Sequence, residues 1–89
     1  MKRKNSKEYL FYMYSFNNDA IPESYQTYSC KYKSKDDALS RMKAEYFVQR
    51  ERYESQGDAI SESCLRPERH YGWLSTESGM HIEMSIIEA

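Results

Sequence analysis

The fold is decided by residues 34–57, SKDDALSRMKAEYFVQRERYESQG. In the segments before this stretch apolar residues recur at every second position, as in a strand, whereas within it they recur every three or four positions, as in a helix. Its apolar residues fall within about 100° of one another on a helix of 3.6 residues per turn. They are Ala38, Leu39, Met42, Tyr46 and Tyr53, with Phe47 on the flank. The spacing predicts a helix over roughly residues 35–56 that buries one side.

The two ends of this segment carry helix-capping residues. Ser34 is a candidate N-cap, and Gly57 can adopt the left-handed conformation that ends a helix. Two oppositely charged pairs at a spacing of four, Asp37–Arg41 and Arg50–Glu54, can form ion pairs on the solvent side.

Two segments before the helix alternate as strands do. The first, Glu8 to Phe16, has Tyr9, Phe11 and Met13 on one face and four residues on the other: Leu10, Tyr12, Tyr14 and Phe16. The second, Glu23 to Lys33, turns Tyr28, Cys30 and Tyr32 inward and Tyr25, Thr27, Ser29, Lys31 and Lys33 outward. Their short connection predicts a β-hairpin.

The segments after the helix also indicate strands. A short strand is expected over Ala59 to Leu65, followed by an interruption at Pro67 to His70. A hairpin follows, with strands Tyr71–Ser75 and Met80–Glu88, of which the second turns Met80, Ile82, Met84 and Ile86 inward. We expect an α+β fold with a single helix on a four- or five-stranded antiparallel sheet, in the order ββαβ(β)β.

Composition limits the classes of protein. The chain has 89 residues, of which 39% are hydrophobic and 30% charged, as expected for a single globular domain. We place that domain at residues 8–89, after a flexible basic arm at residues 1–7. The net charge of −1 argues against a strongly basic nucleic-acid coat and a strongly acidic mimic. No apolar run approaches the length of a membrane span, so we expect a cytoplasmic protein without a membrane partner.

Residues that could carry chemistry are few. The soft metal ligands Cys30, Cys64, His70 and His81 lack the spacing of a zinc site. Three isolated glycines form neither a phosphate-binding loop nor a dinucleotide fingerprint, and no Gly-x-Ser-x-Gly motif is present. We therefore expect no metal, no cofactor and no enzymatic activity. The two thiols are expected to be reduced and largely buried, although the sequence leaves a bridge between them open.

One helix can cover only one face of the sheet, so the other tyrosine-rich face is the expected contact surface. The candidate partner-binding residues are Tyr12, Tyr14, Tyr25, Lys31 and Lys33 on the outer sheet face, with Phe47 and Val48 on the helix. They predict a small protein-binding module that occludes the surface of another protein or of a second copy, as a homodimer. Size and layout, without a shared motif, associate it with small inhibitors encoded by phages or mobile elements.

An alternative is a platform for single-stranded nucleic acid. Lys31, Lys33 and Lys35 lie beside Tyr25, and the arm adds further cations, so rings for base stacking and ammonium groups for phosphates occur together. Against this alternative, residues 8–89 hold nine cations and fourteen anions.

Overall fold

The computed structural model describes residues 8–17 and 25–88. These contain one α-helix and five strands, with a short 3-10 helix between the third and fourth strands: β1 (Tyr9–Asn17), β2 (Gln26–Tyr32), α1 (Lys35–Glu54), β3 (Ile60–Arg66), η2 (Pro67–Arg69), β4 (Tyr71–Thr76) and β5 (Met80–Glu88). The predicted α+β class is confirmed, and the sheet has five strands. The arm predicted at residues 1–7 lies outside the described residues.

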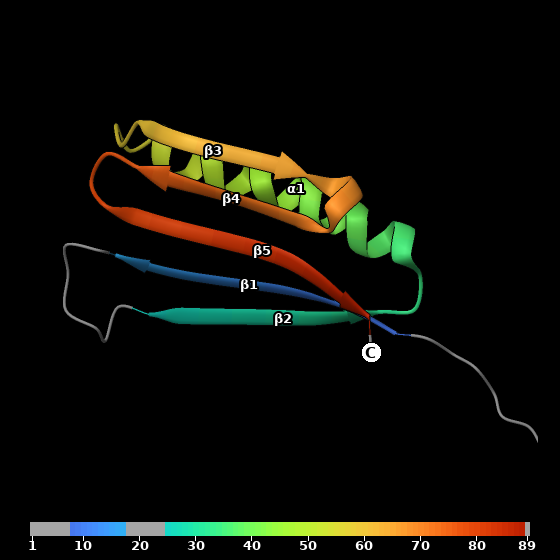
Figure 1. Ribbon diagram of the computed structural model, residues 1–89. Helices are drawn as coiled ribbons and strands as arrows, with labels where there is room; N and C mark the ends of the chain where they lie inside the picture. Colours follow the sequence, from blue (N-terminus) through green and yellow to red (C-terminus); the bar gives the residue numbers. More distant parts are fainter. Residues whose placement is uncertain (1–7, 18–24, 89) are drawn as a thin grey trace, which may run out of the picture.

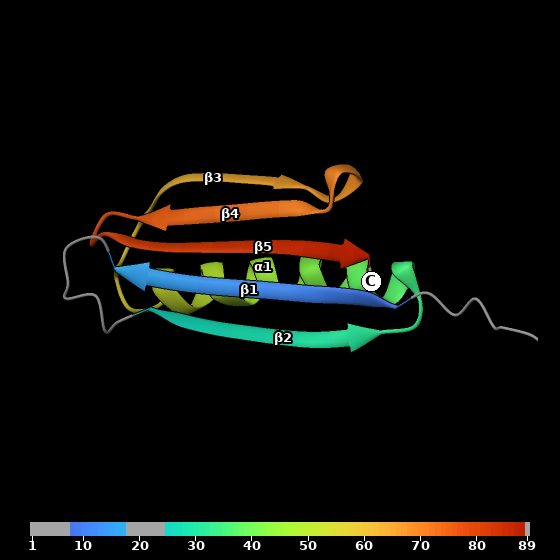
Figure 2. The ribbon, with the colours of Figure 1, turned by 60° about the horizontal axis from the view of Figure 1, so that its bottom comes forward.

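All neighbouring strands are antiparallel, in the order β2-β1-β5-β4-β3. The predicted hairpins β1–β2 and β4–β5 are both present. The helix carries the chain from β2, at one edge of the sheet, to β3 at the other (Figure 1). Figure 2 shows α1 behind β5 and β1, so that among the described elements only one face of the sheet is covered.

The core lies between α1 and the covered face. Its largest fully buried side chains come from the helix and from three strands: Phe11, Met42, Leu74, Ile82 and Met84. Burying each such side chain stabilises the fold by ~1.5–3 kcal/mol before conformational entropy is subtracted. The predicted inward face of β5 and the apolar side of the helix are therefore confirmed, and on β1 the inward face is the one that carries Tyr9, Phe11 and Met13.

The helix begins and ends close to the predicted positions. The backbone N–H of Asp37 donates to Ser34 Oγ at 3.3 Å, which confirms the N-cap. Gly57 has a φ of 83°, and its N–H donates to the carbonyl of Glu54 at 3.0 Å. On the solvent side Arg50 and Glu54 form the expected ion pair at 3.6 Å, whereas Arg41 pairs with Glu45 at 3.1 Å.

The strand boundaries correct the expectation for Lys33, and the strand order excludes the bridge that the sequence left open between the two thiols, which are half-buried where the sequence predicted largely buried. β2 ends at Tyr32, so Lys33 lies in a bend after the strand and not on its outward face. Cys30 and Cys64 are free, half-buried thiols on β2 and β3, the two edge strands. Four strand spacings of ~4.8 Å separate these edges by roughly 19 Å. That is beyond the reach of a disulfide, so the two thiols cannot pair within one chain.

Candidate binding face

The uncovered side of the sheet, here called the open face, is rich in aromatic side chains. Alternation along β1, β4 and β5 turns every second residue toward it. We call one connected set of rings the aromatic band: Tyr12, Tyr14 and Phe16 of β1, Tyr25 next to β2, Trp73 of β4 and His81 of β5. The strands that carry these residues face the viewer in Figure 2.

The rings of the aromatic band contact one another in sequence across the sheet. Tyr14 lies 6.0 Å from Tyr12 and 5.7 Å from Tyr25, measured between ring centroids. Phe16 lies 6.4 Å from Tyr25 and 5.2 Å from His81, which in turn lies 5.7 Å from Trp73. Aromatic pairs at such distances each contribute ~0.5–1.5 kcal/mol beyond the area that they bury. The band is therefore held in shape by its own contacts.

Exposure differs along the band. Tyr25 is 51% exposed, whereas Tyr12, Tyr14 and Trp73 are half-buried although no described element covers them. Neighbouring rings shield one another from water. The open face thus presents the sides and tips of a packed aromatic layer.

Two tyrosines of the band, Tyr14 and Tyr25, and Tyr71 of β4 have raised pKa values. Burial, with a hydrogen bond to Glu83 and the charge of that carboxylate, raises the pKa of Tyr14 to about 12. A hydrogen bond with Tyr12 raises the pKa of Tyr25, and burial raises that of Tyr71. The hydroxyl protons of Tyr14 and Tyr25 are thus engaged in hydrogen bonds within the chain, and the phenol oxygens can accept a hydrogen bond from a partner.

Ser75, His81 and Glu83 form a hydrogen-bonded chain on the open face. Ser75 lies directly opposite His81 in the β4–β5 ladder, and Glu83 follows His81 on the same face. Ser75 Oγ is 2.7 Å from Nδ1 of His81, and Nε2 of His81 is 2.8 Å from Glu83. Neutral His81 can donate its Nε2–H to Glu83 and accept the hydroxyl proton of Ser75. The chain fixes the ring between Phe16 and Trp73.

Serine hydrolases use this order of hydroxyl, imidazole and carboxylate, with a cleft that holds the substrate. Here the cleft recorded for the described residues lies on the helix side of the sheet, and neither Cys nor His lines it. In residues 8–17 and 25–88, no three His, Cys, Asp or Glu side chains gather as they would to hold a metal ion.

Charges on the open face are mixed. Lys31 projects from β2, and its ammonium lies 3.8 Å from the carboxylate of Glu8. Strand register also places Glu62 and Arg66 of β3 on this face, together with Glu83 of β5. The face therefore lacks the single-sign field that a phosphate backbone favours.

The predicted partner-binding residues fall on two sides of the molecule. Tyr12, Tyr14, Tyr25 and Lys31 lie on the open face, as predicted. Phe47 and Val48 lie on the flank and outer side of α1, on the opposite side of the molecule from the open face. Their side chains are 59% and 57% exposed. Sequence reasoning did not select Trp73, His81 or Glu83. The alternation of Trp73 with buried Leu74 was the signal that could have found the first of these.

No family model, no curated protein and no solved structure matches this chain. Among the described residues, no helix combines the length and the apolar character that crossing a membrane requires.

Proposed function

We propose that this protein is a non-enzymatic binding module that docks its open face on another protein and occludes part of that protein's surface. The observation that carries the proposal is the aromatic band on the side of the sheet that no described element covers. Tyr and Trp are enriched at the centres of protein interfaces, where they bury much area at a small cost in conformational entropy.

The charges favour a protein as the partner. Lys31 is close to Glu8, and Glu83 accepts from His81, so these two ionic groups of the open face have partners within the chain. A protein surface with an apolar centre and backbone or side-chain donors at its rim would complement the rings and their phenol oxygens.

Occlusion fits a flat face that offers contact area without a cleft. Blocking a partner's functional surface would make the module an inhibitor, the role common among small proteins of phages and mobile elements that have this size and layout. A second copy of the chain is the other protein that could cover the face, as a homodimer.

A matched pair of substitutions tests the proposal. Tyr25→Ala and Phe47→Ala each remove an aromatic side chain of similar exposure, 51% and 59%, from opposite sides of the molecule. Wild-type protein serves as bait in a nuclease-treated native cytosol, and the captured partner is then titrated against both variants. We expect Tyr25→Ala to weaken binding roughly 30-fold, as loss of ~2 kcal/mol implies, and Phe47→Ala to leave it unchanged.

The reverse pattern would move the interface to the helix and overturn the proposal. Light scattering of the purified protein adds a second measurement. A dimer that Tyr25→Ala converts to a monomer would assign the open face to self-association.

A second candidate function is binding of single-stranded nucleic acid. Such a platform needs ring faces for bases and cations for phosphates. Tyr25 is 51% exposed at the start of β2, and Lys31 lies on the same face about 20 Å further along that strand, not beside Tyr25 as predicted. This function predicts binding that weakens steeply with salt and is lost when Lys31 and Lys33 are both changed to Glu. Binding to a protein would resist salt and survive nuclease treatment.

A further inference from the structure

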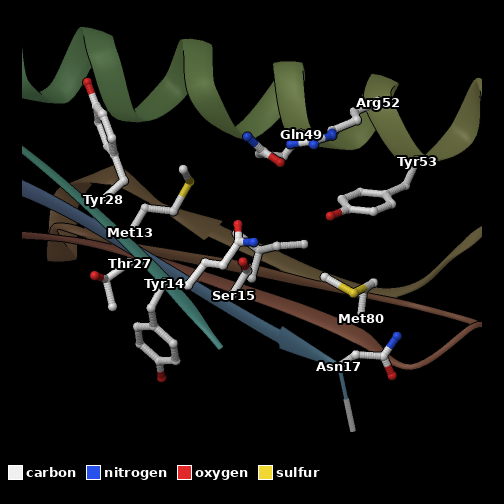
Figure 3. Close-up of a pocket in the computed structure, with 12 residues that line it drawn as sticks. Met13, Tyr14, Ser15, Asn17, Thr27, Tyr28, Gln49, Arg52, Tyr53 and Met80 are labelled. Carbon is white, nitrogen blue, oxygen red and sulfur yellow. The ribbon is translucent and has the colours of Figure 1, made fainter. Parts of the chain in front are cut away.

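A cleft of about 350 Å³ opens on the helix side of the sheet. Of the aromatic band only Tyr14 lines it, and Figure 3 shows the ring of Tyr14 pointing away from the helix. It lies between the second half of α1 and the ends of β1, β2 and β5 that meet there. Figure 3 shows Gln49, Arg52 and Tyr53 on the helix side of the cleft and Met13 and Met80 on the strand side. Its volume is within the range of small-molecule sites, ~300–1,000 Å³.

The strand side of the cleft is apolar. Ile82 belongs to the buried core, and Met13 and Met80 pack against that core from its margin. Methionine side chains are flexible and polarizable, so this wall can adapt to the shape of an apolar guest.

Gln49 places a polar group where the helix is otherwise apolar. The residue is only 7% exposed, and its amide nitrogen donates to Glu45 at 2.7 Å. No described residue donates to its amide oxygen. A buried acceptor without a donor destabilises the fold, so a ligand that brought a donor would gain from satisfying it.

Arg52 adds a cation at the same place. The other two arginines of α1 have carboxylate partners, Glu45 for Arg41 and Glu54 for Arg50. The guanidinium of Arg52 instead lies 5.8 Å from the centre of the Tyr53 ring, and no carboxylate of the described residues forms an ion pair with it. It lines the cleft and can bind an anionic group.

We propose that this cleft is a binding site for a small carboxylic acid with an apolar body and an adjacent N–H or O–H donor. The body would contact Met13, Met80 and Ile82, the carboxylate would pair with Arg52, and the donor would satisfy the amide oxygen of Gln49. The site is separate from the open face, so neither proposal depends on the other.

The test uses N-acetyl-leucine as the probe, because it carries an apolar body, an N–H and a carboxylate. N-acetyl-leucinamide is its uncharged match. Each is titrated into the full chain while the methyl resonances of the methionines and the side-chain amide of Gln49 are followed by NMR. We expect saturable shifts at Met13, Met80 and Gln49 with the acid, and binding at least tenfold weaker with the amide.

Variants assign the binding to the cleft. Arg52→Gln is expected to weaken binding of the acid at least tenfold, whereas Arg50→Gln, which removes a cation from the same helix outside the cleft, should leave it unchanged. Gln49→Leu is expected to weaken binding, since it removes the acceptor for the ligand's donor. Absence of saturable shifts, equal binding of acid and amide, or equal effects of the two arginine variants would overturn the proposal.

Discussion

Neighbouring residues of β1 provide a direct test of the difference between the two faces of the sheet. Phe11 is fully buried beneath α1, with the ring of Tyr28 at 6.3 Å and the guanidinium of Arg41 at 5.3 Å from its ring centre. Tyr12 points to the open face, where the centroid of its ring lies 6.0 Å from that of Tyr14. Phe11→Ala and Tyr12→Ala therefore remove aromatic rings of similar size, one residue apart, from opposite environments.

The expected losses differ severalfold. Phe11→Ala should lower the free energy of unfolding by about 3–5 kcal/mol, through lost burial and the cavity left behind. Tyr12→Ala removes one aromatic pair and part of its burial, which together amount to ~1–2 kcal/mol. A domain of 89 residues is stable by roughly 4–13 kcal/mol, and each kcal/mol shifts its melting temperature by ~4–8 °C.

Urea denaturation followed by far-ultraviolet circular dichroism measures both losses. If Phe11→Ala does not fold, Phe11→Leu replaces it, with an expected loss of about 1–2 kcal/mol, and is then compared with Tyr12→Leu. An equal loss for the two positions would refute the reasoning, because it would mean that both faces are buried in the folded species. So would a melting temperature that rises with protein concentration and loses that dependence in Tyr12→Ala.

Three further outcomes are expected. By NMR of ring-labelled tyrosine, Tyr14 should ionise near pH 12, above its ordinary pKa of 10.0, and Glu83→Gln should lower that pKa. Because folded Tyr14 holds its proton more tightly than unfolded Tyr14, its contribution to the free energy of unfolding should be present below pH 10 and be lost as pH rises toward 12. Ser34→Ala should cost about 1 kcal/mol in chemical denaturation, whereas Ser34→Asp should retain the cap. Gly57→Ala should cost ~1–2 kcal/mol because φ is positive there, and Gly57→Asn should cost less by the same assay.

The sequence predicted the parts of the fold that depend on local periodicity. The alternation of Ile82, Met84 and Ile86 and the helical spacing of Ala38 and Met42 are properties of short segments, and each correctly identified a buried face. The position of Arg41 could not be found in this way. Its guanidinium lies over the rings of Phe11 and Tyr28 and donates to the hydroxyl of Tyr32 at 3.1 Å, groups that only the packing of α1 on β1 and β2 brings to it.

The candidate site was predictable only in part, for a similar reason. Alternation placed Tyr12 and Tyr14 on one face, but the aromatic band also requires β5 to lie between β1 and β4. That neighbourhood brings His81 between Phe16 and Trp73, residues far apart in the sequence. Strand order follows from the path of the whole chain, so the period of a single segment does not encode it.

The pairing of β1 with β5 also has a consequence for biosynthesis. Tyr9 lies opposite Glu88, so the middle of the sheet joins the earliest and the latest strands of the described chain. A nascent polypeptide can form the β1–β2 hairpin and α1 while it is still being translated. The sheet lacks its central strand, β5, until residues 80–88 have left the ribosome. Contacts between such distant residues slow folding, and the inner edge of β1 is open to foreign strands meanwhile. A product truncated before residue 80 would therefore lack the central strand of the sheet, and we expect chaperones and proteases to bind it because it cannot fold.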